Sequence, residues 1–190
     1  MGRKIAMLNM LDDIIRRHLP ELLKDSNQWD SLIVNRRKPY TYRVFHQFSN
    51  DVRICLHKFD VCSATESFIH PHPWPGAFVV MYGCYRIQVG YSRDRVSPPE
   101  SVTKLILSRF SMYEIDNPLT WHSVTPLEPT YTIMVNGIPW DKETVAHKEV
   151  RTTVGKDLDK MPEEDLKQHL QVFKSFCHDY NLQFKRIPKE

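Results

Sequence analysis

The sequence has no long apolar run. No stretch reaches the ~18 consecutive apolar residues that a transmembrane helix needs. The N-terminal stretch MGRKIAMLNMLDDIIRR is interrupted by acidic and basic residues, whereas a secretory signal peptide needs an unbroken apolar core. We therefore expect a cytoplasmic protein with no membrane partner.

The chain also has few cysteines and a small net charge. The 190 residues include four cysteines, without a CxxC pair, which argues against a disulfide framework and against a structural zinc cluster. Lys and Arg total 26 against 23 Asp and Glu, a formal net charge of +3. This balance does not indicate nucleic acid as a partner, so we expect a small-molecule ligand or substrate.

The two ends of the chain carry helical patterns. Apolar residues from Lys4 to Lys24 recur at helical spacing, and Pro20 is expected to break or restart this helix. Near the other end, MPEEDLKQHLQVFKSFCHDYN has an apolar stripe at steps of three and four, with Pro162 near its first helical position. Because His169 and His178 lie off that stripe, we expect both at the surface.

The middle of the chain has the composition of a β domain. Short β-branched and aromatic runs are separated by turn residues: YTYRVFHQF, DVRICLHKFDV, AFVVMYGCYRIQVGY, SVTKLILSRFSMYEI, TWHSVTPL and TYTIMVNGIPW. No helix-length periodic segment separates them, which favours an all-β sandwich or barrel over βαβ units. The predicted organisation is a helical arm at residues 1–38, a β-barrel at 39–145, and a C-terminal extension with an amphipathic helix at 146–190.

Two histidines one residue apart precede the most apolar of these runs, in FIHPHPWPGAFVVMYGCYRI. Side chains alternate along a strand, so His70 and His72 would face the same way and form half of a metal site. A catalytic metal typically has about three protein ligands and open positions for substrate. His122, in NPLTWHSVTPL about fifty residues further on, is the best candidate for the third ligand.

This pattern resembles the two motifs of the cupin superfamily: HxH, an apolar strand with a glycine at Gly83, then a single histidine in a later strand. The stretch LHKFDVCSATESFIHPHPWPGAFVVMYGCY is similar to a group of bacterial and phage cupin-like proteins with an HxHPW signature. The resemblance covers about residues 52–140. It implies a mainly β double-stranded β-helix, the cupin jelly roll, with N- and C-terminal helical extensions. By analogy with cupins that pair through sheet edges, it also implies a homodimer.

The chain departs from the usual cupin motif. A Glu normally follows the second histidine by four or five residues, where this chain has Gly76 and Ala77. The three remaining histidines resemble the ligand set of cysteine dioxygenase, and EPTYTIMVNG resembles the corresponding strand of the thiol dioxygenases. Where that family has a Ser, His, Tyr relay, this chain has Thr132, Met134 and Asn136. The resemblance therefore does not extend to cysteine oxidation.

Three neutral imidazoles would leave bound Fe(II) with its full charge, which favours an anionic substrate. The sequence thus predicts a metal-binding cupin, of the mononuclear non-heme iron dioxygenase type, acting on a small polar or anionic molecule. Fe(II) is the expected metal, with Zn, Ni or Mn as alternatives. No catalytic residue is assigned. The candidate cavity or substrate residues are His57, Trp74, Tyr82, Arg86, Thr132 and Met134.

Two other functions fit the same fold, because jelly rolls host unrelated chemistries. One is a binding or regulatory cupin that holds a ligand without turnover. The other is a metal-independent sugar epimerase or isomerase, in which His57 would act as the base and Tyr82 as the acid.

Overall fold

The computed structural model describes residues 7–140 and 158–184. Helical segments lie at both ends: α1 (Met7–Asp13), the π-helical turn η1 (Ile14–His18), α2 (Leu19–Leu22), the 3-10 turn η2 (Ser26–Gln28) and α4 (Glu163–Gln183). Pro20 lies in the first turn of α2, where its missing N–H costs no helical hydrogen bond, so the helix restarts there. Within residues 7–140 and 158–184, no helix is long and apolar enough to cross a membrane.

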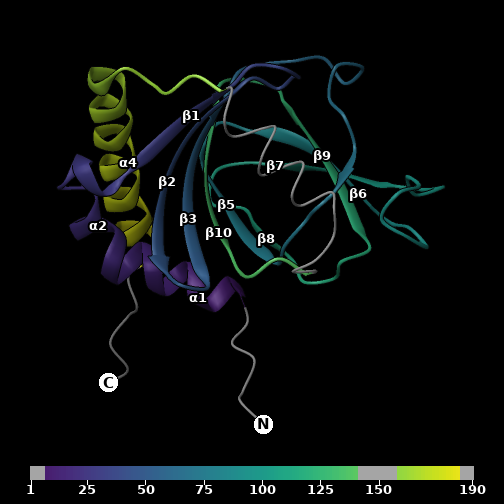
Figure 1. Ribbon diagram of the computed structural model, residues 1–190, viewed down its shortest axis with the longest axis horizontal. Coiled ribbons are helices and arrows are strands. Elements are labelled where there is room, and N and C mark those ends of the chain that lie inside the picture. Colours follow the sequence, from purple (N-terminus) through teal and green to yellow (C-terminus); the bar gives the residue numbers. More distant parts are fainter. Residues whose placement is uncertain (1–6, 141–157, 185–190) are drawn as a thin grey trace, which may run out of the picture.

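The strands form two antiparallel sheets. The six-stranded sheet has the order β1 (Asp30–Val34), β2 (Thr41–Ser49), β3 (Val52–Phe59), β10 (Thr130–Asn136), β5 (Gly76–Tyr82) and β8 (Met112–Ile115). The four-stranded sheet has the order β4 (His70–Pro71), β9 (Thr120–Pro126), β6 (Tyr85–Tyr91) and β7 (Thr103–Leu107). The two sheets face each other across the interior of the molecule (Figure 1).

The strand pairing from β3 to β10 defines the fold. β3 pairs with β10, β4 with β9, β5 with β8, and β6 with β7, so the eight strands form one long hairpin. This hairpin is rolled so that its pairs alternate between the two sheets. That arrangement is the jelly roll, the double-stranded β-helix of the cupins. The predicted fold class is confirmed, with β1 and β2 added at one edge of the six-stranded sheet.

Helices from both ends cover the outer face of the six-stranded sheet (Figure 1). The apolar stripe of α4 is buried there, which confirms the amphipathic helix. The buried side chains of this interface include Leu11, Ile14, Leu170, Phe173 and Tyr180 from the helices, and Val44, Ile54, Leu56, Val79, Ile133 and Val135 from the strands. The Tyr180 hydroxyl donates to Oδ1 of Asp12 at 2.8 Å and ties α4 to α1.

The two histidines of α4 differ from each other. His178 is exposed as expected, but His169 is buried at 5% exposure, so its predicted surface position is wrong. Its ring lies 5.1 Å from that of Phe173 and 6.3 Å from that of Tyr131. The sheet covers a wider face of α4 than the apolar stripe alone, because the Tyr131 side chain on β10 also reaches the helix.

The segment boundaries differ in one respect from those expected. β1 (Asp30–Val34) lies within residues 1–38, which the sequence assigned to a helical arm, and it belongs to the six-stranded sheet. The strand layer therefore begins before residue 39. The expected boundary between 145 and 146 lies outside the described residues.

Candidate metal centre

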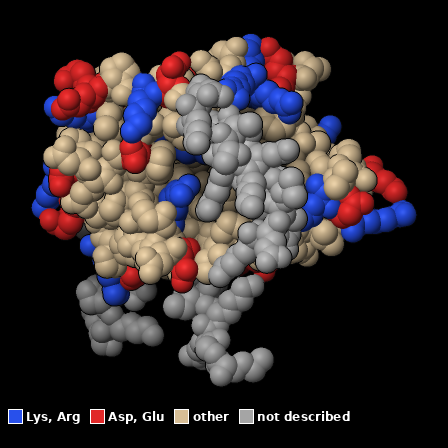
Figure 2. All heavy atoms as spheres, in the orientation of Figure 1, with Lys and Arg blue, Asp and Glu red and all other residues tan. Residues whose placement is uncertain are grey.

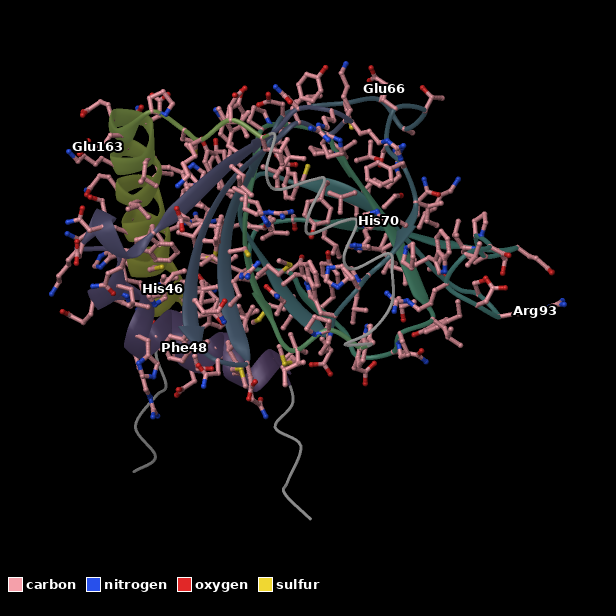
Figure 3. All side chains as sticks on the ribbon, in the orientation of Figure 1. His46, Phe48, Glu66, His70, Arg93 and Glu163 are labelled. Carbon is pink, nitrogen blue, oxygen red and sulfur yellow. The ribbon has the colours of Figure 1, made fainter. Side chains whose placement is uncertain are left out.

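Three histidines come together between the sheets. His70 of β4 is the direct cross-strand partner of His122 on β9, and their ring centroids are 4.8 Å apart. The backbone N–H of His72 donates to the carbonyl of Thr120 at 3.3 Å, which extends the same pairing by two residues. The rings of His72 and His122 are 5.2 Å apart. Figure 3 shows His70 between the two sheets.

Backbone carbonyls orient two of the three rings. Nδ1 of His72 lies 2.6 Å from the carbonyl oxygen of Trp74, and Nδ1 of His70 lies 3.4 Å from that of Phe68. A carbonyl only accepts, so Nδ1 carries the proton and Nε2 keeps its lone pair. Nδ1 of His122 is buried and has no hydrogen-bond partner within the described part of the chain. Among the described residues, no hydrogen bond to Nδ1 orients the ring of His122.

The three imidazoles are neutral near pH 7. Burial lowers the pKa of His72 to about 3 and holds the pKa of His122 well below its usual value. Burial also lowers the pKa of His70, against the opposing effect of its hydrogen bond to Phe68. Neutral imidazole is the form that binds metal ions, so no proton has to leave these rings first.

The three rings share one face, but their nitrogens do not point at one common position. Within residues 7–140 and 158–184, no group of three or more His, Cys, Asp or Glu side chains is placed to hold a metal ion. Rotation of the imidazoles about their side-chain bonds would be needed to aim three nitrogens at one position. Gly76, where cupins usually have the Glu ligand, lies beside His72: an added Cβ would be 3.5 Å from Cε1 of that ring.

Aromatic side chains surround the histidines. The Trp74 ring lies 5.6 Å from that of His72, which places this predicted cavity residue beside the cluster. Phe78, which the sequence did not single out, lies 5.4 Å from His72 and 5.9 Å from His122. Met134 packs in the same inner cluster as Phe78. These apolar neighbours are what desolvates the imidazoles.

Two further predicted residues lie on the inner face of the six-stranded sheet, with a partner that the sequence did not reveal. His57 and Thr132 are cross-strand partners on β3 and β10, and Oγ1 of Thr132 lies 3.4 Å from Nδ1 of His57. On the other side, Nε of Arg43 donates to Nε2 of His57 at 2.9 Å. The only signal for Arg43 in the sequence is its alternation with Val44 in YTYRVFHQF, which does not say which face is the inner one.

The structure does not bring Tyr82 to the cavity. Simple alternation on β5 would place it on the same face as Phe78, but a register shift in the pairing with β10 sets Tyr82 opposite Tyr131. Such a bulge moves the next side chain to the other face of the sheet. Tyr82 is 48% exposed, and its ring stacks on that of Phe176 of α4 at 5.7 Å.

Arg86 also points away from the histidines. Its neighbours Tyr85 and Ile87 are buried in the core between the sheets. Because side chains alternate along a strand, Arg86 lies on the outer face of the four-stranded sheet. The predicted roles of Tyr82 and Arg86 in the cavity are therefore corrected.

A cavity of about 650 Å³ lies along β6, β7 and β8, and its lining includes Val89, Tyr113 and Ile115 but none of the histidines. The Tyr113 ring stacks on Phe78 at 4.5 Å, and Phe78 in turn contacts His72. The cavity adjoins the histidines, because Val89 in its lining is the cross-strand partner of His122.

No family model and no curated protein matches the sequence. Solved structures that align with this chain include hydroxypropylphosphonic acid epoxidase from S. wedmorenis, at 12% identity and a TM-score of 0.44, covering 56% of this chain and 55% of that chain. A structure of Fe(II)-HppE with an alternative substrate aligns at 13% identity and a TM-score of 0.44, covering 56% and 55%. KdgF from Halomonas sp. aligns at 16% identity and a TM-score of 0.40, covering 54% and 83%. The chain thus spans about half the length of the first two structures, and its fold is defined by its own strand pairing.

Proposed function

We propose that this chain is a metal-binding cupin whose single metal ion is held by His70, His72 and His122. The observation that carries the proposal is three neutral imidazoles on one inner face. The ring centroid of His122 lies 4.8 Å from that of His70 and 5.2 Å from that of His72. We further propose a non-heme iron enzyme of the dioxygenase type, acting on a small polar or anionic molecule.

The residues around the histidines have definite roles in this proposal. The carbonyls of Phe68 and Trp74 accept from Nδ1 of His70 and His72, which leaves Nε2 of each ring as the ligand atom. Phe78 and Trp74 pack against the rings and keep water from the ligand nitrogens. Bound Fe(II) would supply one-electron and oxygen chemistry, while Zn, Ni or Mn would suit the same nitrogen donors.

Metal analysis tests the site directly. We expect the purified untagged protein to bind about one divalent metal per chain, and the His122→Ala variant to lose it. His178→Ala removes an exposed histidine far from the site and should keep the metal. A wild-type protein that neither contains metal nor binds added Fe(II) would rule out the metal centre.

Oxygen uptake then separates catalysis from binding. Iron-loaded protein would be mixed with a panel of amino, thiol and keto acids under reducing conditions. Uptake that needs both iron and one of these acids supports the dioxygenase. Intact iron binding without uptake across the panel would favour the binding or regulatory cupin, with which the absence of the Ser, His, Tyr relay agrees.

The metal-independent epimerase is not favoured by the structure. That alternative needs His57 as a base and Tyr82 as an acid on the same cavity. Tyr82 instead stacks on α4 outside the sheets, and Nε2 of His57 accepts from Arg43.

A further inference from the structure

We infer that Arg43 and His57 form an anion-binding subsite inside the jelly roll, with Arg43 binding a ligand oxyanion and His57 positioning its guanidinium. The inference deepens the proposed function and rests on it for the link to the metal. It assigns the ligand to a chemical class: a small molecule with a carboxylate or similar oxyanion, and a second polar group that reaches the histidines.

The strand register places Arg43 on the inner face. Arg43 of β2 is the cross-strand partner of His57 on β3. Its neighbour Val44 is buried in the outer cluster beneath the helices, whereas Phe45 packs with the inner cluster that contains Phe78. Since side chains alternate, Arg43 extends from the same face as Phe45, toward the opposite sheet.

His57 holds one edge of the guanidinium. Nε of Arg43 donates to Nε2 of His57 at 2.9 Å, so the imidazole proton is on Nδ1, which lies 3.4 Å from the hydroxyl of Thr132. His57 is 4% exposed. Burial and, second, the Arg43 charge hold its pKa well below the usual value, so it remains a neutral acceptor. Among the residues that the structure describes, no hydrogen bond occupies the terminal N–H groups of Arg43, so they can bind a ligand.

Arg43 carries its charge at a half-buried position. Among the residues that the structure describes, no carboxylate forms an ion pair with Arg43, whereas Arg109 pairs with Asp179 at 2.6 Å on the surface. A partly buried cation is costly unless it is paired. Figure 2 shows Lys or Arg side chains near the middle of this face of the molecule, with mostly uncharged residues around them.

The geometry of a guanidinium selects the ligand group. Its planar fork of N–H donors matches the two oxygens of a carboxylate, and such charge-assisted pairs are about twice as strong as neutral hydrogen bonds. With Nε held by His57, the remaining edge is preoriented, so less side-chain entropy is lost when an anion binds. The ligand would then have one end on Arg43 and the other at the histidines.

Binding of small probes to the metal-free protein tests the subsite. NMR titrations would compare propionate, methylphosphonate and propionamide, of which the last has the shape of propionate without its charge. We expect an oxyanion to bind at least about tenfold more tightly than propionamide. A preference for propionate or for methylphosphonate identifies the type of oxyanion, and either supports the subsite. Equal binding of all three would overturn it.

Variants test whether Arg43 binds the anion and whether His57 positions the Arg43 guanidinium. Arg43→Gln should lower oxyanion affinity about tenfold or more without changing propionamide binding. Arg43→Lys, which lacks the fork, should recover only part of the loss. His57→Gln keeps an acceptor for Nε and should bind oxyanions nearly as the wild type does, whereas His57→Leu should not. If both His57 variants bind equally well, His57 does not position Arg43.

The two proposals can fail separately. His122→Ala should lose the metal and still bind the oxyanion in metal-free protein. Metal binding without a charge preference would remove the subsite and leave the metal centre standing. A charge preference that depends on Arg43, in a protein that binds no metal, would do the reverse.

Discussion

At the scale of single residues, Gly83 occupies a position where an added side chain would disturb the fold. It joins β5 to β6 with φ at +79°, in the left-handed region that favours glycine. A Cβ at this position would lie 2.6 Å from the carbonyl oxygen of Pro129 and 2.9 Å from Oγ1 of Thr130. The Thr130 hydroxyl also donates to the carbonyl of Cys84 at 3.0 Å, so the neighbouring chain cannot retreat without losing that bond.

Gly83→Ala should therefore lower the free energy of unfolding by about 1–3 kcal/mol, from the left-handed backbone and the close contacts together. Urea denaturation would measure it. Gly76→Ala is the matched control, because its added Cβ would meet no atom closer than 3.4 Å and its φ is not positive. Equal losses in the two variants would show that the backbone at Gly83 is not restrictive.

Features that depend on near neighbours in the chain could be predicted from single residues. Alternation alone placed His70 and His72 on one face, and the structure shows both rings beside that of His122. Their role as metal ligands stays a prediction. Alternation failed for Tyr82, because the bulge opposite Tyr131 depends on pairing with a strand about fifty residues away.

At the scale of elements, the helix α4 packs a polar group into its interface with the six-stranded sheet. Nε2 of His169 is buried and has no hydrogen-bond partner in the described structure. Burial lowers the pKa of His169 to about 4, although a hydrogen bond to the backbone of Leu56 opposes this shift. In the unfolded chain the imidazole would have its ordinary pKa, so acid protonates the unfolded state first.

This histidine makes the α4 interface sensitive to acid. The folded pKa is below the unfolded one, so the contribution of His169 is complete above pH 6.5 and is lost as the pH falls toward about 4. Between pH 6.5 and about 4, the free energy of unfolding of the His169→Leu variant should therefore fall by roughly 3 kcal/mol less than that of the wild type. Urea unfolding at several pH values would measure this difference. His178→Leu, at an exposed position of the same helix, is the control. An unchanged pH slope in His169→Leu would contradict the assignment.

At the scale of the whole molecule, the proposed metal ion would connect neighbouring parts of the roll. β4 consists of only two residues, His70 and Pro71, and pairs with β9 through His122 and Trp121. Such a short pairing contributes little backbone stability by itself. A metal bound by imidazoles from both sides of this pairing would hold it in place and stabilise the folded state by mass action.

We expect a divalent metal at a hundredfold excess over its Kd to stabilise the protein by about 2.7 kcal/mol. For a chain of this size that raises the Tm by roughly 5–10 °C. Thermal unfolding with Co(II), or with Fe(II) under anaerobic conditions, would measure the shift, and His122→Ala should show none. A similar shift in His122→Ala would mean that the metal binds elsewhere.

The sequence by itself determined the features that depend on local periodicity. Alternating apolar runs, turn residues between them and the amphipathic stripe of α4 were enough to predict a β sandwich or barrel with helical ends, because strand and helix periods are properties of short segments. The jelly roll followed from the resemblance of the histidine pattern to the cupin motifs. The tertiary structure alone decided which residues meet. Arg43 lies against His57, His169 is buried under the sheet and Tyr82 lies outside it, because strand register and the stacking of layers depend on pairings between segments far apart in the chain.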